Sequence, residues 1–212
     1  MIIRGDILKK FDWKKGINKK ELDEVIETLI DGGIVIFPTD TVYGIACDCL
    51  NEKSIKRLYE IKKRPSYKPI NVLTNDISKI ELITTKVSEL EKKLINKYMP
   101  GALTLIMTKN DTLPNILTSG LETIGVRIPD NEIAIEILKK FSYPLATTSV
   151  NISGEKDGIE LADFIEEFAD KVDIIIDGGK SKIGIPSTIA KVSDNSFEIL
   201  RQGTIEIKEE EL

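Results

Sequence analysis

The sequence contains no histidine, and this absence excludes several common catalytic and metal-binding sites. Neither a Ser-His-Asp triad nor a Cys-His pair can form, and no zinc site can use an imidazole ligand. The two cysteines, Cys47 and Cys49, are too few for a zinc site of four thiolates, and we expect both to be reduced and buried. Any catalysis must therefore rest on Lys, Arg, Asp, Glu, Ser, Thr or Tyr, or on a metal with oxygen ligands.

Long apolar runs are also absent. The longest ones, such as Ile34–Phe37 and Ile174–Ile176, fall far short of the roughly 20 residues of a membrane-spanning helix. The first residues, MIIRGDILKKFDWKK, lack the apolar stretch and cleavage site of a signal peptide. We therefore expect no membrane association and a cytoplasmic location.

The composition is that of a folded globular protein with a slight excess of acidic residues. Of 212 residues, 41% are hydrophobic and 31% are charged, and the formal net charge is −5. This charge argues against nonspecific nucleic-acid binding as the main role. The segment 53–68 nevertheless holds seven basic residues against the single acid Glu60, and by itself this run is typical of a solvated helix face.

Helix and strand patterns alternate along the chain, which predicts an α/β domain with a mixed sheet. Helices are expected from the cap residue Asn18 to Ile30, around Ile55–Tyr59, and at Val87–Tyr98, Asn131–Phe141 and Phe164–Phe168. Strands are expected at Ile34–Phe37, Pro69–Leu73, Leu103–Thr108, Thr123–Ile128, Pro144–Ser149, Val172–Ile176, Ser187–Val192 and Phe197–Leu200. We predict a single domain over 1–212, with its core at about 18–204 and a loosely docked or frayed acidic tail at 205–212.

Polar segments follow two of the predicted elements. Pro38–Gly44 brings two hydroxyls, a carboxylate and a phenol to the end of a buried strand, where ligands bind in α/β sheets. An ordinary turn that uses threonine and aspartate side chains is the alternative. Lys62–Pro65 places cations at a helix end, either to offset the helix dipole or to bind polyphosphate.

Two further strands carry polar side chains on one face. Arg127 lies within a predicted strand, where a guanidinium needs an anionic partner. That partner is either a ligand or a structural Asp or Glu. Thr147, Ser149 and Asn151 alternate to one face at the end of another strand, and they suit either a polar ligand or a hydroxyl-rich turn.

Taken in order, seven segments resemble the YrdC-like family of threonylcarbamoyl-AMP synthases. They are GGIVIFPTDTVYGIACD, IKKRPSYKPINVL, YMPGALTLIM, TIGVRIPD, PLATTSVNISGE, STIA and LRQGTI. The similarity runs from about Gly32 to Thr204, as in the short single-domain members. It implies a twisted mixed sheet with flanking helices around a large concave cavity.

The resemblance also implies a reaction. L-Threonine, bicarbonate and ATP would give L-threonylcarbamoyl-AMP and pyrophosphate, with Mg²⁺ held mainly by the substrate phosphates. A separate complex would then transfer the threonylcarbamoyl group to tRNA at position 37. Direct contact of this chain with tRNA or double-stranded RNA is left open.

Site residues follow from the family motifs. The catalytic signature falls on Lys62, Arg64, Ser149 and Asn151. The implied ATP contacts are Lys62, Ser66, Thr123, Ser149, Asp157 and Arg201. The implied threonine contacts are Thr39, Asn71, Arg127, Thr147 and Ser187, with Asn71 standing where many relatives have a histidine.

Two alternative functions stay open at this point. One is a noncatalytic YrdC-like paralogue that binds double-stranded RNA or tRNA through the basic run at 53–68. The other is a carbamoyltransferase that forms a carbamoyl adenylate, although the zinc-finger and acylphosphatase modules of such proteins are not found in this sequence.

Overall fold

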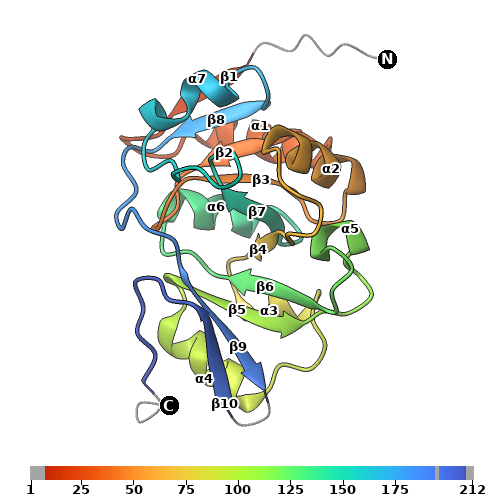
Figure 1. Cartoon of the computed structure of the whole chain (residues 1–212). Helices are drawn as coiled ribbons and strands as arrows, with labels where there is room; N and C mark the ends of the chain where they lie inside the picture. The colour runs from red at the N-terminus through yellow and green to blue at the C-terminus, as the bar shows by residue number, and fades with distance from the viewer. Residues whose placement is uncertain (1–7, 194–195, 209–212) are drawn as a thin grey trace.

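The computed structural model describes residues 8–193 and 196–208, which form a twisted open sheet flanked by helices (Figure 1). The strand order is β1-β8-β2-β3-β7-β4-β6-β5-β9-β10. In chain order the strands are β1 (Lys9–Asp12), β2 (Val35–Phe37), β3 (Gly44–Asp48), β4 (Asn71–Leu73), β5 (Leu103–Thr108), β6 (Thr123–Arg127), β7 (Leu145–Ser149), β8 (Ile174–Asp177), β9 (Thr188–Ser193) and β10 (Ser196–Arg201). Parallel pairs such as β4–β6 and β5–β9 occur in the same sheet as antiparallel pairs such as β5–β6, so the predicted mixed α/β fold is confirmed.

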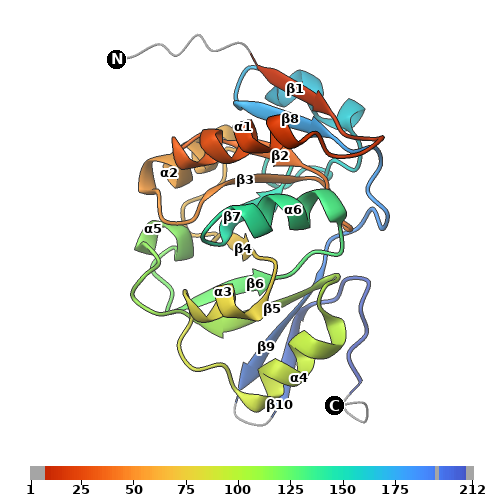
Figure 2. The same cartoon turned by 180° about the vertical axis from the view of Figure 1, so that it is seen from behind.

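Helices cover both faces of this sheet. They are α1 (Lys19–Ile30), α2 (Glu52–Ile61), α3 (Ile77–Glu81), α4 (Glu89–Tyr98), α5 (Asn115–Thr118), α6 (Glu132–Lys140) and α7 (Ile165–Phe168), with a 3₁₀ turn at Leu161–Asp163. Figure 2 shows α1 and α6 side by side over one face, and Figure 1 shows α2, α5 and α7 over the other. The side chain of Asn18 caps α1 by accepting from the backbone N–H groups of Lys20 and Glu21, as the sequence predicts.

The sheet is buried on both sides near β2. Val35 and Phe37 pack into the core beneath α1 and α6, whereas Ile34 and Ile36 pack into the opposite core. The continuous apolar run therefore forms a strand buried on both faces, as expected. Cys47 and Cys49 are both buried and free, and burial raises the pKa of both thiols.

Four short elements escape prediction from the sequence. Strand β1 lies at the edge of the sheet and reads KKFD. It holds a single hydrophobic residue and therefore shows no alternation of apolar and polar side chains, yet it pairs in parallel with β8. Strand β3 follows β2 after a turn and is nearly all buried, so no alternation marks it. The helices α3 and α5 span five and four residues, which is too short for a helical period to show.

The start of the tail is docked on the sheet. The backbone N–H of Ile205 donates to the Thr188 hydroxyl at 3.1 Å, and that hydroxyl donates to the Ile205 carbonyl at 2.7 Å. Ile205 and Ile207 also pack against the core, while residues 209–212 lie outside the described residues. Within 8–193 and 196–208, no helix is both long and apolar enough to cross a membrane.

Candidate ligand-binding site

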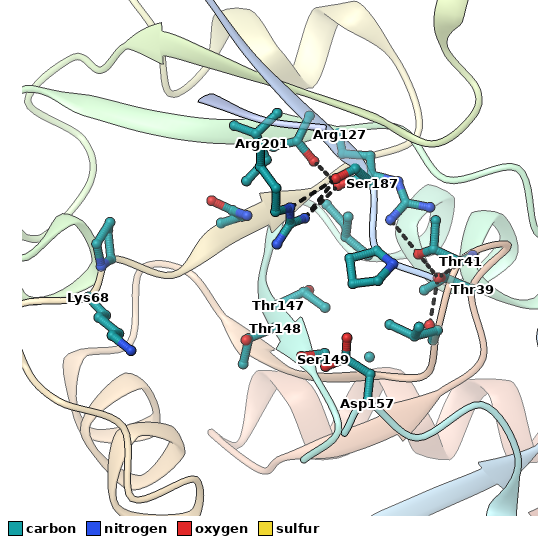
Figure 3. A pocket seen from close by; sticks show the side chains of 18 of the residues that line it. Thr39, Thr41, Lys68, Arg127, Thr147, Thr148, Ser149, Asp157, Ser187 and Arg201 are labelled. Atoms are coloured by element: carbon teal, nitrogen blue, oxygen red, sulfur yellow. Dashed lines mark hydrogen bonds between the residues drawn. The ribbon is translucent and has the colours of Figure 1, made fainter. Parts of the chain in front are cut away.

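A cavity of about 410 Å³ opens over the central strands (Figure 3). Strands β3, β7, β4, β6, β5, β9 and β10 each contribute lining residues, so segments far apart in the sequence meet there. Cross-strand partners lie on the same face of a sheet, which explains this convergence. The partners in question are Ser149 with Gly44, Thr147 with Asn71, Ile106 with Gly125, and Arg201 with Ile189.

Two glycines keep the floor of the cavity open. A Cβ atom at Gly125 would collide with the side-chain oxygen of Asn71, and one at Gly44 would lie 2.9 Å from a methyl group of Thr147. Both contacts are closer than those that real Cβ atoms make. Asn71 and Thr147 can therefore lie flat over these positions only because no side chain is present there.

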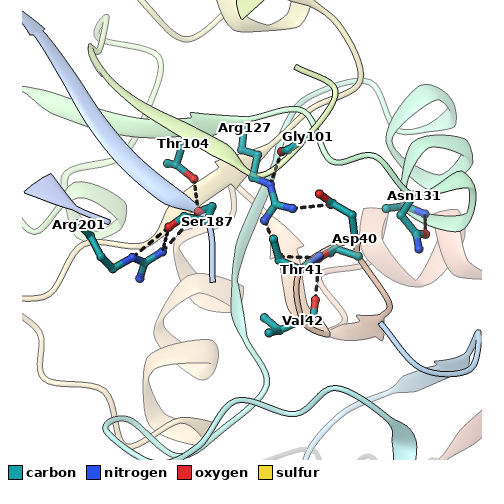
Figure 4. A network of polar contacts seen from close by, with 11 residues as sticks. Asp40, Thr41, Val42, Gly101, Thr104, Arg127, Asn131, Ser187 and Arg201 are labelled. Carbon is teal, nitrogen blue, oxygen red and sulfur yellow. Dashed lines mark hydrogen bonds and ion pairs between the residues drawn. The ribbon is translucent and has the colours of Figure 1, made fainter. Parts of the chain in front are cut away.

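Arg127 lies at the base of the cavity and is almost completely buried (Figure 4). Its guanidinium donates to the Asp40 carboxylate, to the Thr41 hydroxyl at 2.7 Å and to the Gly101 carbonyl at 2.9 Å. Burial lowers the pKa of Arg127, and the nearby Asp40 partly offsets this effect. Of the two partners that the sequence allowed for Arg127, a structural acid is the one seen here. Three of five N–H groups are used, which leaves two for a ligand within the described structure.

A second polar network joins Arg201 to Ser187. The Arg201 guanidinium donates to the Ser187 carbonyl at 2.8 and 3.1 Å and to its hydroxyl at 3.3 Å. The Ser187 hydroxyl shares a hydrogen bond of 2.8 Å with that of Thr104, which is buried. Side chains from β5, β10 and the segment before β9 are thereby held in one arrangement (Figure 4).

The segment between β2 and β3 extends the network of Arg127. The Thr39 hydroxyl donates to the Val42 carbonyl at 2.7 Å and lies 3.0 Å from the Thr41 hydroxyl, which in turn accepts from Arg127. Asp40 points its carboxylate at Arg127 from the same turn. The turn predicted from Pro38–Gly44 is thus present, and two of its threonines also line the cavity.

Lys62 lies beneath the cavity and is 1% exposed. Its ammonium donates to the carbonyl of Ser149, to the carbonyl of Asn151 at 3.0 Å and to the side-chain oxygen of Asn151 at 2.7 Å. Burial lowers the pKa of Lys62 to about 7, and the charge of Arg64 adds to this effect. Lys62 and Asn151 therefore support the end of β7 from below, and neither lines the cavity in the described structure.

The segment after α2 forms one side of the cavity. Arg64 donates to the carbonyls of Lys68 at 3.1 Å and Pro69 at 2.8 Å, and all three residues line the cavity. Burial lowers the pKa of Arg64. The cations at this helix end are therefore part of the cavity wall.

The cavity unites most of the residues implied by the family resemblance. Nine of them line it, namely Thr39, Arg64, Asn71, Arg127, Thr147, Ser149, Asp157, Ser187 and Arg201. Lys62 and Asn151 lie beneath it, as described above. Ser66 lies in the exposed turn after Arg64, and Thr123 lies at the far end of β6 opposite Thr108, so neither contributes to the lining.

Three polar lining residues belong neither to the predicted turn at Pro38–Gly44 nor to the site residues implied by the motifs: Lys68, Thr104 and Thr148. Thr104 lies in a strand that reads as apolar, and only its pairing opposite Ile189 places it on the cavity face. Lys68 belongs to the basic run, which by composition alone resembles a solvated surface. Alternation along the strand groups Thr104 with Ile106 on one face, but only the structure shows that this face lines the cavity.

Comparisons with known proteins agree with this fold. The family Sua5_yciO_yrdC, described as "Telomere recombination", matches residues 27–203. A "Putative threonylcarbamoyl-AMP synthase" of Methanocaldococcus jannaschii is 38% identical over 208 residues, with 98% of each chain covered. The "Threonylcarbamoyl-AMP synthase" of Bacillus subtilis is 35% identical over 89% of this chain, which spans only 55% of that relative.

Solved structures of related proteins have the same fold. A variant of Sua5 from Pyrococcus abyssi superposes with a TM-score of 0.92 at 31% identity, covering 96% of this chain and 63% of that one. The structure of P. abyssi Sua5 complexed with L-threonine gives a TM-score of 0.86 at 31% identity, covering 92% of this chain and 57% of that one. The chain thus spans little more than half the length of these longer relatives.

Proposed function

Because this chain belongs to the Sua5/YciO/YrdC family, we propose that it makes L-threonylcarbamoyl-AMP and pyrophosphate from L-threonine, bicarbonate and ATP. One observation carries this proposal. Three guanidinium groups, those of Arg64, Arg127 and Arg201, line a single cavity together with several hydroxyls. Such a cavity suits two anionic substrates that must meet. The M. jannaschii and B. subtilis relatives carry the name of this activity, and P. abyssi Sua5 has been solved with L-threonine.

The reaction has two steps. The threonine amine attacks the carbon of bicarbonate, and loss of water gives a carbamate. A carbamate oxygen then attacks the α-phosphorus of ATP, and pyrophosphate leaves in line with the attack. Phosphoryl chemistry of this kind depends on positioning and on charge stabilisation more than on a protein nucleophile. The absence of histidine is therefore compatible with this reaction.

We assign the amino-acid carboxylate to Arg127. Its two remaining N–H groups suit a carboxylate, and its other three are fixed by Asp40, Thr41 and Gly101. The hydroxyls of Thr39, Thr147 and Ser187 and the amide of Asn71 would then surround the rest of the amino acid. Threonine differs from serine by one methyl group, so a hydrophobic contact would discriminate between them by only about 1–3 kcal/mol.

We assign the phosphates of ATP to the other two arginines of the cavity, Arg64 and Arg201. Arg64 from the segment after α2, Arg201 from β10 and Ser149 from β7 all line the cavity. Lys62 holds Ser149 from beneath, and direct contact of its ammonium with phosphate requires it to exchange at least one of its three oxygen acceptors. Asn151 shares this supporting role, because its side-chain oxygen accepts from both Lys62 and Ser149.

The residues present fit a magnesium ion that is bound mainly by the substrate. Asp157 is the one carboxylate among the residues that line the cavity, and no group of three metal-ligating side chains occurs within 8–193 and 196–208. Mg²⁺ commonly keeps several waters and binds through one or two carboxylates plus phosphates. We propose that Asp157 and the phosphates would hold the ion, which would neutralise phosphate charge.

We further propose that a separate complex transfers the threonylcarbamoyl group from the product to tRNA. The product is a mixed anhydride of a carbamate and a phosphate, and it therefore requires an acceptor. No residue of the cavity is assigned to tRNA. A transfer assay with purified product and tRNA tests this step separately from synthesis.

The test of synthesis is product formation by the purified chain. With L-threonine, bicarbonate, ATP and Mg²⁺, we expect threonylcarbamoyl-AMP by mass spectrometry and an equal amount of pyrophosphate. Omission of either threonine or bicarbonate should abolish both. Pyrophosphate release that needs carbamoyl phosphate instead of threonine would favour the carbamoyltransferase. Salt-sensitive binding of double-stranded RNA without turnover would favour the noncatalytic paralogue.

A further inference from the structure

We infer that a second, smaller cavity binds a small zwitterion of the amino-acid class, with its ammonium group at Glu91 and its carboxylate at Lys86. This cavity has a volume of about 250 Å³. It is lined by the segment between α3 and α4, by the first turn of α4 and by the ends of β5 and β9 (Figure 2). Among the described residues, it shares none of its lining with the cavity of the candidate ligand-binding site. Pockets for drug-sized ligands are larger, so this one suits a small molecule.

Glu91 supplies a buried carboxylate that the protein binds through only one of its oxygens. The residue lines the small cavity and is 8% exposed. Its Oε2 accepts from the backbone N–H of Ser88 at 2.7 Å and completes the cap of α4. Its Oε1 has no hydrogen-bond or ion-pair partner among residues 8–193 and 196–208. Because a buried carboxylate is costly without an opposite charge, this oxygen favours a cationic ligand.

The hydroxyls that line the small cavity favour a ligand that donates hydrogen bonds. The Thr84 hydroxyl already donates to the Ile80 carbonyl at 2.9 Å, so it can only accept from a ligand. The Ser88 hydroxyl accepts from the backbone N–H of Glu91 at 3.2 Å and keeps a second lone pair. The Thr108 hydroxyl has no hydrogen bond to a described residue. A primary ammonium has three N–H donors, which match one carboxylate oxygen and two hydroxyls.

Lys86 and two apolar side chains account for the rest of the ligand. Lys86 is exposed and lines the same cavity, where its positive charge repels a metal ion or a simple amine and attracts a carboxylate. Met107 and Val192 supply the apolar part of the lining. A ligand with both charges pairs with Glu91 and Lys86 together, and a small aliphatic side chain suits Met107 and Val192. An amino acid has all three parts.

An NMR titration of the whole chain, followed by its backbone amide signals, tests the inference with three probes of similar size. The probes are L-alanine, ethylammonium and propionate, which carry both charges, the positive charge alone and the negative charge alone. We expect L-alanine to shift the signals of segment 84–91 and of Met107 and Thr108. Ethylammonium should shift the same signals with about fivefold weaker affinity or less, and propionate should leave them unchanged.

Substitutions then assign the two charges. Glu91→Gln keeps an acceptor for the cap of α4 but removes the charge, and we expect about tenfold weaker binding of L-alanine. The matched control is Glu89→Gln, which removes an acid from the same turn outside the cavity and should bind like wild type. Lys86→Met should weaken L-alanine binding about threefold without weakening ethylammonium binding. Thr108→Val removes an exposed hydroxyl, so it should fold normally and also weaken L-alanine binding about threefold.

Three results would overturn the inference. The first is equal binding of L-alanine by Glu91→Gln and Glu89→Gln. The second is ethylammonium or propionate binding as tightly as L-alanine, because one charge would then be sufficient. The third is the absence of shifts in segment 84–91, including the case in which L-alanine shifts only signals of the larger cavity, such as those of Thr39 and Arg127. The proposed function is independent of all three, because it is tested by product formation.

Discussion

Arg127 and Asp40 form a buried ion pair at the base of the cavity, with side-chain exposures of 8% and 2%. The second carboxylate oxygen of Asp40 has no hydrogen-bond partner among the described residues. The pair joins β6 to the turn after β2, so the cavity and the fold depend on the same contact. Removal of either charge would leave the other buried and uncompensated.

Asp40→Asn is therefore expected to destabilise the protein strongly. Loss of one member of a buried pair typically costs about 3–5 kcal/mol. Urea unfolding measures this change. The matched control is Asp23→Asn, because Asp23 pairs with Lys140 at the surface and should contribute less than about 1 kcal/mol. Equal effects of the two substitutions would contradict the proposed importance of the buried pair.

Arg127→Lys keeps the positive charge but removes the planar fork. We expect the KM for L-threonine to rise by about tenfold or more, while the KM for ATP changes by less than about threefold. Steady-state kinetics with each substrate varied in turn measures both values. A larger rise for ATP than for threonine would show that Arg127 is assigned to the wrong substrate.

Thr104→Val removes the hydroxyl that lies against Ser187 while it nearly preserves side-chain volume. The hydroxyl of Ser187, which we assign to threonine, is then no longer held in place, and we expect roughly fivefold weaker binding of threonine, or about 1 kcal/mol. Thr104→Ser retains the hydroxyl and should recover most of the affinity. If valine and serine weaken binding equally, the methyl group of Thr104 matters and its hydroxyl does not.

The burial of Lys62 predicts a specific pH dependence of stability. Its pKa is about 7 in the folded chain, below the ordinary lysine value of 10.5. Above pH 7, the unfolded chain therefore binds a proton at this residue that the folded chain does not. The contribution of Lys62 to stability should accordingly rise with pH between about 7 and 10, by up to about 1.4 kcal/mol per pH unit.

Urea unfolding of wild type and Lys62→Met at pH 7, 8 and 9 measures this contribution. The difference in unfolding free energy between the two proteins should shift in favour of wild type as the pH rises. Other titrating groups are common to both proteins and cancel. Parallel pH profiles would mean that the ammonium keeps its proton in the folded chain throughout this range.

The sequence predicts long elements with a regular apolar period more accurately than short elements. The helices at α1, α4 and α6 and the strand β5 all lie close to their expected positions. Edge strand β1 and the short helices α3 and α5 carry too few apolar residues to produce a pattern. Their positions depend on tertiary contacts, such as the parallel pairing of Lys9–Asp12 with β8.

The site shows a similar division. Motif order identifies residues of the cavity wall such as Arg64, Arg127 and Arg201, because they lie in recognisable segments. It does not show that Lys62 faces carbonyl oxygens under the wall, or that Thr123 lies at the end of β6 away from the cavity. The position of Thr123 depends on strand length and register, because two residues along a strand span roughly 7 Å. The contacts of Lys62 depend on which oxygen atoms lie against the end of α2 in the folded chain.

The most direct measurement is a crystal structure of the chain soaked with L-threonine and ATP. Both ligands should occupy the one cavity, with the threonine carboxylate on Arg127 and the phosphates toward Arg64 and Arg201. Binding of the two ligands at separate surfaces, or of the threonine carboxylate away from Arg127, would contradict the proposed site.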